Sequence, residues 1–122
     1  MINLNSLMIG THDPKRLGEF YEKVLDKKPD MQDGSWYGFS AGSTYLSIGE
    51  HSEVKGSAKE PARLMLNFES QEVKEEFERI SKIDGVKVIK EPYEMQGAWI
   101  ATLADPDGNY FQLMTPWSDG KN

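Results

Sequence analysis

Few side chains in this sequence have the types and spacing that catalysis requires. The two histidines lie outside the regular elements: His12 falls in a predicted strand-to-helix turn, and His51 falls in a polar stretch. We interpret both as solvent-exposed residues rather than metal ligands. Asp105 and Asp107 belong to a turn motif, which explains them better than a paired acid and base. Residue positions also give no support for a Ser-His-Asp triad.

Composition excludes several further classes of function. Cysteine is absent, so disulfides, thiolate zinc sites and cysteine nucleophiles are excluded. The net charge is −6 without a basic cluster, which argues against nucleic-acid binding. There is no glycine-rich phosphate loop, no apolar run near the ~20 residues of a membrane span, and no signal-peptide pattern. We expect a cytoplasmic protein with no nucleic-acid or membrane partner.

Two polar residues are the sharpest candidates for ligand contacts. Arg63 can receive a carboxylate or phosphate through its guanidinium fork, or it can form an ordinary ion pair with one of the many acidic residues. Gln112 can orient a ligand through its amide, or it can satisfy a neighbouring polar group. The acidic composition favours a cationic ligand, whereas Arg63 favours an anionic group, and the sequence leaves both open.

Alternation along the predicted strands places these two residues on one face with other polar and aromatic residues. An aromatic-lined concavity with a few polar groups is typical of small-molecule sites, although each aromatic residue alone also fits core packing or a dimer interface. Trp36, Tyr37 and Trp99 lie on strands whose facing the pattern does not fix. The other candidates for this concave face are Ser6, Met8, Tyr45, Ser47, Met65, Asn67, Tyr110 and Met114.

These side chains depend on a repeated order of elements. Strand 3–11 precedes a helix that begins at Asp13-Pro14 and ends at Lys28-Pro29, and short strands follow at 36–39 and 44–48. After a polar linker the order starts again. It comprises strand 62–68, a helix capped by Ser70 that ends at Asp84-Gly85, and strands at 86–89, 99–103 and 109–114. Asp105-Pro106-Asp107-Gly108 forms the last hairpin turn. The pattern predicts an α+β fold of two similar halves.

The order and motifs resemble the vicinal oxygen chelate superfamily, which includes glyoxalase I, extradiol dioxygenases, and fosfomycin and bleomycin resistance proteins. The resemblance rests on Asp13 followed by Phe20-Tyr21 and Val24-Leu25, and on Asp105 to Asn109 followed by Phe111-Gln112-Leu113. It covers the whole chain, 1–122, as one domain. It implies two βαβββ modules, at about 1–50 and 62–117 with a linker at 51–61. It also implies a curved mixed sheet around a shared cavity, and often a homodimer.

The resemblance also implies where a metal would bind in the family's enzymes. The matching positions here carry Ser6, Ser47, Arg63 and Gln112 instead of histidines and carboxylates, and this set does not suit a transition metal. We therefore expect no metal and no cofactor. We expect a protein that binds or sequesters a small molecule, and we favour this role over that of an enzyme. The alternatives are a metal-dependent lyase or dioxygenase with displaced ligands, and a dimeric interaction module with a filled cavity.

Overall fold

The computed structural model describes residues 1–116 and divides the chain into two compact units, with the boundary between Gly56 and Ser57. The first unit contains β1 (Ser6–Thr11), α1 (Pro14–Leu25), β2 (Met31–Asp33), β3 (Trp36–Ala41) and β4 (Thr44–Glu50). The second contains β5 (Leu66–Glu69), α2 (Val73–Ile80), β6 (Lys87–Met95), β7 (Ala98–Ala104) and β8 (Tyr110–Met114). The predicted α+β class with two βαβββ modules is confirmed. Trp117, the last residue of the predicted second module, lies outside the described residues.

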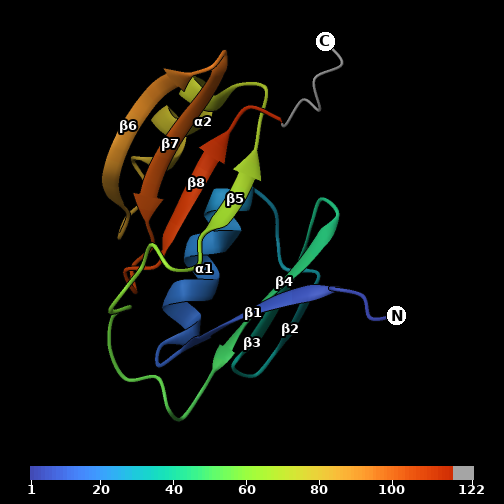
Figure 1. Ribbon diagram of the computed structural model, residues 1–122. Helices are drawn as coiled ribbons and strands as arrows, with labels where there is room; N and C mark the ends of the chain where they lie inside the picture. The colour runs from blue at the N-terminus through green and yellow to red at the C-terminus, as the bar shows by residue number, and fades with distance from the viewer. Residues whose placement is uncertain (117–122) are drawn as a thin grey trace. The chain divides into compact units, whose positions relative to one another are not determined.

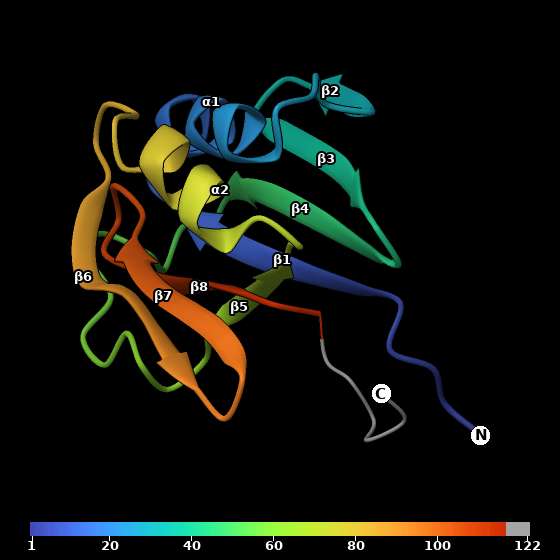
Figure 2. The same cartoon turned by 90° about the horizontal axis from the view of Figure 1, so that it is seen from above.

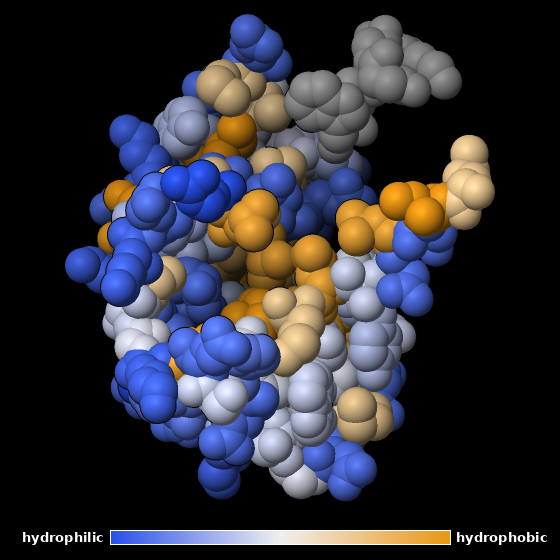
Figure 3. Space-filling model, turned by 60° about the horizontal axis from the view of Figure 1, so that its bottom comes forward, coloured by the Kyte–Doolittle hydropathy of each residue, from blue (hydrophilic) through white to orange (hydrophobic). Residues whose placement is uncertain are grey.

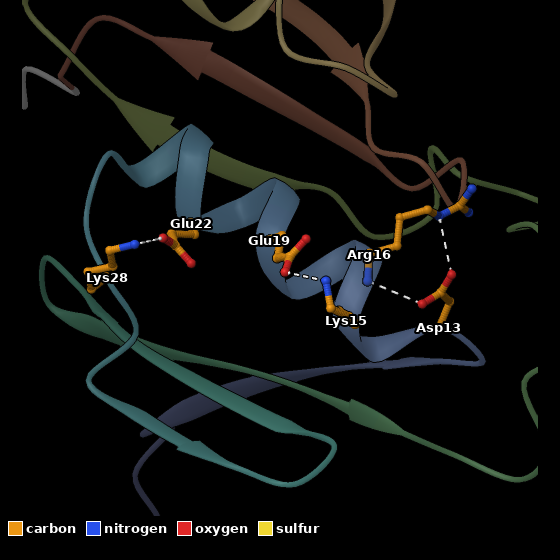
Figure 4. Close-up of polar contacts among 6 residues, drawn as sticks. All are labelled: Asp13, Lys15, Arg16, Glu19, Glu22 and Lys28. Carbon is orange, nitrogen blue, oxygen red and sulfur yellow. Dashed lines mark hydrogen bonds and ion pairs between the residues drawn. The ribbon is translucent and has the colours of Figure 1, made fainter.

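Helix α1 begins as the sequence predicts. The Asp13 carboxylate accepts a hydrogen bond from the Arg16 backbone N–H at 3.2 Å, and Pro14 occupies the first helical turn. The helix ends at Leu25, before the predicted Lys28-Pro29, because Asp26 adopts a left-handed conformation with φ 54°. Figure 4 shows the ion pairs on its exposed side, including Lys15 with Glu19 at 2.7 Å.

The first sheet has the strand order β1-β4-β3-β2, with β1 parallel to β4 and the other pairs antiparallel. Alternate residues of β3 and β4 form the core of this unit with the apolar side of α1 (Figure 2). The closest approach is at Gly18, where an added Cβ would lie 2.6–2.7 Å from three ring atoms of Tyr37. The buried residues of the unit include Leu17, Phe20, Tyr21, Val24, Tyr37, Phe39, Leu46 and Ile48.

The second sheet has the order β5-β8-β7-β6 and repeats the pattern, with β5 parallel to β8. The prediction of a strand from residue 62 is wrong, because the Arg63 backbone N–H bonds the Glu60 carbonyl in a turn and β5 begins only at Leu66. Helix α2 is also shorter than predicted. Its N-cap is Glu72 rather than Ser70, whose hydroxyl instead accepts from the Glu72 backbone N–H at 2.9 Å.

The turn from Asp105 to Gly108 is confirmed. The Asp105 carboxylate accepts hydrogen bonds from the backbone N–H groups of Asp107 and Asn109, both at 2.9 Å. Gly108 has φ 86°, a conformation that a residue with a Cβ rarely adopts. This turn sets the register of β7 against β8, in which Thr102 lies opposite Gln112. Within the described part of the chain, no helix is both long and apolar enough to cross a membrane.

Gly18→Ala tests the contact between α1 and the first sheet. The added methyl group must displace the Tyr37 ring, and overpacking of this kind costs about 1–3 kcal/mol. This cost exceeds the gain in helix propensity of about 1 kcal/mol. Chemical denaturation is expected to show a net loss of stability, whereas Gly56→Ala, with open space around its Cβ, changes stability by less than about 0.5 kcal/mol. A Gly18→Ala protein as stable as its parent would contradict this packing.

Asp30 ties the segment after α1 to the end of β3, because its carboxylate accepts from Lys27 Nζ at 2.8 Å and from the Ser40 backbone N–H at 2.6 Å. These two hydrogen bonds, the lysine first, hold the pKa of Asp30 below its ordinary value. The stabilisation is therefore complete above the unfolded pKa of about 3.9 and disappears as the pH falls through the lower folded pKa. Denaturation curves are expected to show Asp30→Asn as less stable than the parent at pH 7, with the difference vanishing in strong acid. A pH-independent difference would contradict this.

Candidate functional site

The candidate site begins on the face of the first sheet opposite α1. Because Tyr37, Phe39, Leu46 and Ile48 turn toward the helix, their neighbours in each strand turn away from it. The register aligns these neighbours in rows across β1, β4 and β3, such as Met8 with Ser47 and Gly38. On this face β1, β3 and β4 carry Ser6, Met8, Gly10, Tyr45, Ser47, Gly49, Trp36, Gly38 and Ser40. Met31 and Asp33 of the edge strand β2 pair with Gly38 and Trp36 and lie on the same side.

Two aromatic rings lie on glycines of this face. A Cβ added to Gly49 would lie 2.5–2.7 Å from three atoms of the Trp36 six-membered ring, so the indole rests directly on the Gly49 backbone. The Tyr45 hydroxyl end likewise covers Gly38. Glycine is required at both positions because any side chain would lift the ring away from the sheet. Trp36 keeps 37% of its surface exposed, so one side of its ring packs on the sheet while much of the rest stays accessible.

The face opposite α1 carries no formal charge on β1, β3 or β4, although 28% of the chain is charged. Its side chains are hydroxyls, aromatic rings and Met8, which is 47% exposed. Figure 3 shows where exposed hydrophobic side chains, in orange, gather among polar ones, in blue, on the side of the molecule drawn there. A molecule held against β1, β3 and β4 would gain dispersion and apolar burial, and a carboxylate, Asp33 of the edge strand β2, lies on the same side as the register partner of Trp36.

The face of the second sheet opposite α2 is also uncharged on its inner strands β7 and β8. Gln112 donates from Nε2 to the Thr102 hydroxyl at 3.1 Å, which fixes the amide and leaves its oxygen as an acceptor. Asn67 lies beside Gln112 in the register, and Tyr110 and Met114 share the same side of β8. Charged residues flank these strands: Glu69 of β5 is the register partner of Met114, and Lys90 lies on the edge strand β6, with Nζ 5.3 Å from the Tyr93 ring centroid.

Four of the candidates from the sequence are placed elsewhere. Tyr37 is only 4% exposed and packs against α1. Trp99 faces α2, where Lys74 Nζ lies 3.8 Å from its ring centroid. Arg63 and Met65 precede β5, so the prediction that puts them on a strand is wrong.

Arg63 pairs with Glu60 instead. The two side chains approach to 2.7 Å across an exposed turn, with 71% of each side chain exposed. This geometry fits the ordinary ion pair that the sequence left open, and it removes the main argument for an anionic ligand. The other nine candidates, Ser6, Met8, Trp36, Tyr45, Ser47, Asn67, Tyr110, Gln112 and Met114, lie on the two faces described above.

The donor set does not fit a transition metal. Within residues 1–116, no three histidine, cysteine, aspartate or glutamate side chains come together as a metal site would require. Ser6 and Ser47 offer only neutral hydroxyls, and the Ser47 hydroxyl lies 3.4 Å from the Leu7 carbonyl. Gln112 offers one amide oxygen. Zinc, nickel and iron bind imidazole and carboxylate donors in preference to these groups.

His51 belongs to the face opposite α1, which the sequence analysis missed. It continues the alternation of Tyr45, Ser47 and Gly49 one step beyond the end of β4, and that alternation is the signal that could have found it. A Cβ added to Gly10 would lie 3.1 Å from His51 Cβ, so this side chain covers Gly10. The backbone N–H of His51 donates to the Thr11 carbonyl at 3.1 Å and holds it there.

Comparison with known families assigns the fold. The model of the glyoxalase-like domain matches residues 6–114, so the chain belongs to the glyoxalase-like family of the vicinal oxygen chelate superfamily. No curated protein matches the chain.

Solved structures agree with this assignment. A glyoxalase-related enzyme from Fulvimarina pelagi is 16% identical, with a TM-score of 0.79 over 99% of this chain and 94% of that one. A glyoxalase/bleomycin resistance protein from Albidiferax ferrireducens T118 is 20% identical, with a TM-score of 0.74 over 91% and 97%. A fosfomycin resistance protein from Mesorhizobium loti is 19% identical, with a TM-score of 0.75 over 96% and 95%. At these identities the likeness concerns the fold alone.

Gly49→Ala tests whether the Trp36 indole lies on the sheet. The new methyl group must push the ring outward, so Trp36 emission is expected to shift to the red and its quenching by acrylamide to increase. The measurement uses a background with Trp99→Phe and Trp117→Phe, so that Trp36 alone emits. Gly34→Ala in the same background is the control, because a Cβ there meets nothing within 4 Å although its positive φ costs some stability. Unchanged Trp36 emission in Gly49→Ala would contradict the placement.

Proposed function

We propose that the protein binds an uncharged small molecule without a metal, on the sheet face opposite α1. The observation that carries this proposal is the Trp36 ring, which rests on Gly49 and keeps 37% of its surface accessible. Aromatic rings that are fixed in place bind flat ligands at a low cost in conformational entropy.

The strands β1, β3 and β4 carry no formal charge on the face opposite α1, and this favours an uncharged ligand. Burying an ionised group without a partner costs several kcal/mol or more, whereas an uncharged ring incurs no such cost. Asp33 of the edge strand β2, the register partner of Trp36, counts further against the anionic ligand that the sequence left open. Sequestration is the role we propose, because the polar side chains that β1, β3 and β4 present on the face opposite α1 are hydroxyls, which do not serve as general acids or bases as a carboxylate or imidazole pair would.

Metal independence gives the first test. Protein purified without a chelator is expected to contain no stoichiometric zinc, nickel, iron or manganese by elemental analysis, because the donors do not suit these ions. Added EDTA is expected to leave ligand binding unchanged. One metal ion per chain would overturn the proposal in favour of a lyase or dioxygenase with displaced ligands.

The two described tryptophans give a second test with a built-in control. We expect a panel of neutral, cationic and anionic aromatic compounds to yield a neutral compound whose binding is detected by calorimetry. Trp36→Leu is expected to weaken its binding about tenfold, the equivalent of about 1.4 kcal/mol. Trp99→Leu, on the side facing α2, is expected to leave the affinity unchanged. Preference for a charged compound, or equal effects of the two substitutions, would contradict the proposal.

We further propose that the protein is a cytoplasmic homodimer. The absence of cysteine is consistent with a reducing compartment, and the family often forms dimers. Light scattering after size exclusion tests the dimer, and twice the 13.8 kDa mass of the chain is the expected result. A monomer would remove this part of the proposal and the alternative of a dimeric interaction module.

A further inference from the structure

His51 and Trp36 occupy neighbouring places on the face opposite α1. Gly10 of β1 and Gly49 of β4 are partners in the parallel register. The His51 side chain covers the first of these glycines, and the Trp36 ring covers the second. Because adjacent strands lie about 4.8 Å apart, the two side chains cover adjacent positions on the sheet. Met8 and Ser47 form the next row of the register and flank this pair.

The turn after β4 fixes the protonation pattern of the His51 imidazole. The Glu53 backbone N–H donates to His51 Nδ1 at 3.2 Å, so Nδ1 is the unprotonated nitrogen and the neutral ring carries its proton on Nε2. The Val54 backbone N–H donates to the His51 carbonyl at 3.0 Å and closes the turn. Within residues 1–116, Nε2 donates to no protein atom. The imidazole therefore presents a free N–H donor beside the indole.

We propose that His51 is a ligand-binding residue whose Nε2–H donates a hydrogen bond to a flat, uncharged aromatic ligand stacked on Trp36. This inference rests on the proposed binding function and narrows it to aromatic compounds that carry an acceptor, such as a ring carbonyl. An indole surface alone accepts any flat ring, whereas a fixed donor at its edge selects a ring with an acceptor. Two carboxylates lie near His51 in the sequence, Glu50 directly before it and Glu53 two residues after it. Their negative charge disfavours an anionic ligand.

Coumarin and naphthalene are suitable probes because both are flat, neutral two-ring molecules and only coumarin carries a carbonyl acceptor. His51→Phe keeps an aromatic ring and removes the donor. It is expected to reduce the ratio of coumarin to naphthalene affinity about three- to tenfold, the effect of losing one neutral hydrogen bond. His12→Phe, at the other exposed histidine, is the matched control and is expected to leave the ratio unchanged.

Nitrogen-15 NMR of the histidine side chains supplies a readout that a structural role would not affect. The free protein is expected to show the proton of His51 on Nε2, and coumarin, but not naphthalene, is expected to shift that resonance. A proton on Nδ1, an affinity ratio unaffected by His51→Phe, or a failure of coumarin to bind would overturn the inference. The proposed binding function would be contradicted by a different result, namely that Trp36→Leu weakens the binding of no compound in the wider panel.

Discussion

The candidate site depends on aromatic rings that pack directly against glycine. Tyr37 lies on Gly18 of α1, and Trp36 lies on Gly49 of β4. Two successive residues of β3 therefore each pack an aromatic ring on a glycine, on opposite sides of one sheet. The Tyr37 contact brings the helix close to the strands. The Trp36 contact holds an indole flat, with part of its surface accessible. Close-packed contacts of this kind tolerate almost no added volume. The lack of a side chain at Gly18 and Gly49 therefore determines the ring positions on both sides of the sheet.

The fold follows a family pattern, but the chemistry of the site departs from it. The resemblance to the superfamily implies metal-ligand positions that here carry Ser6, Ser47, Arg63 and Gln112, which are two hydroxyls, a guanidinium and an amide. Gln112 bonds Thr102 across the strands, so its amide already belongs to a protein hydrogen bond. In metal enzymes of this fold the same positions present imidazoles and carboxylates. Because this chain lacks those ligands there, we propose that it binds a small molecule without a metal.

Local signals predict the fold well, since each one acts within a few residues. The Asp13 cap, the Asp105 to Gly108 turn and the alternation in β4 and β8 are all confirmed by hydrogen bonds and burial. The site is harder to predict because strand facing depends on register. Trp99 and Tyr37 turn to the helices, which periodicity in short strands does not reveal. Arg63 lies in a turn closed by Glu60, and its pairing with that neighbour required the three-dimensional structure.

The most direct test of the account is fluorine-19 NMR of protein labelled with 5-fluorotryptophan. Resonances are assigned by substituting each tryptophan in turn, and a neutral aromatic ligand is then titrated into the protein. The account predicts that the Trp36 signal shifts with saturation at one ligand per chain, in the presence or absence of EDTA, while the Trp99 signal stays in place. A shift confined to Trp99, or a Trp36 response that requires an added metal ion, would contradict it.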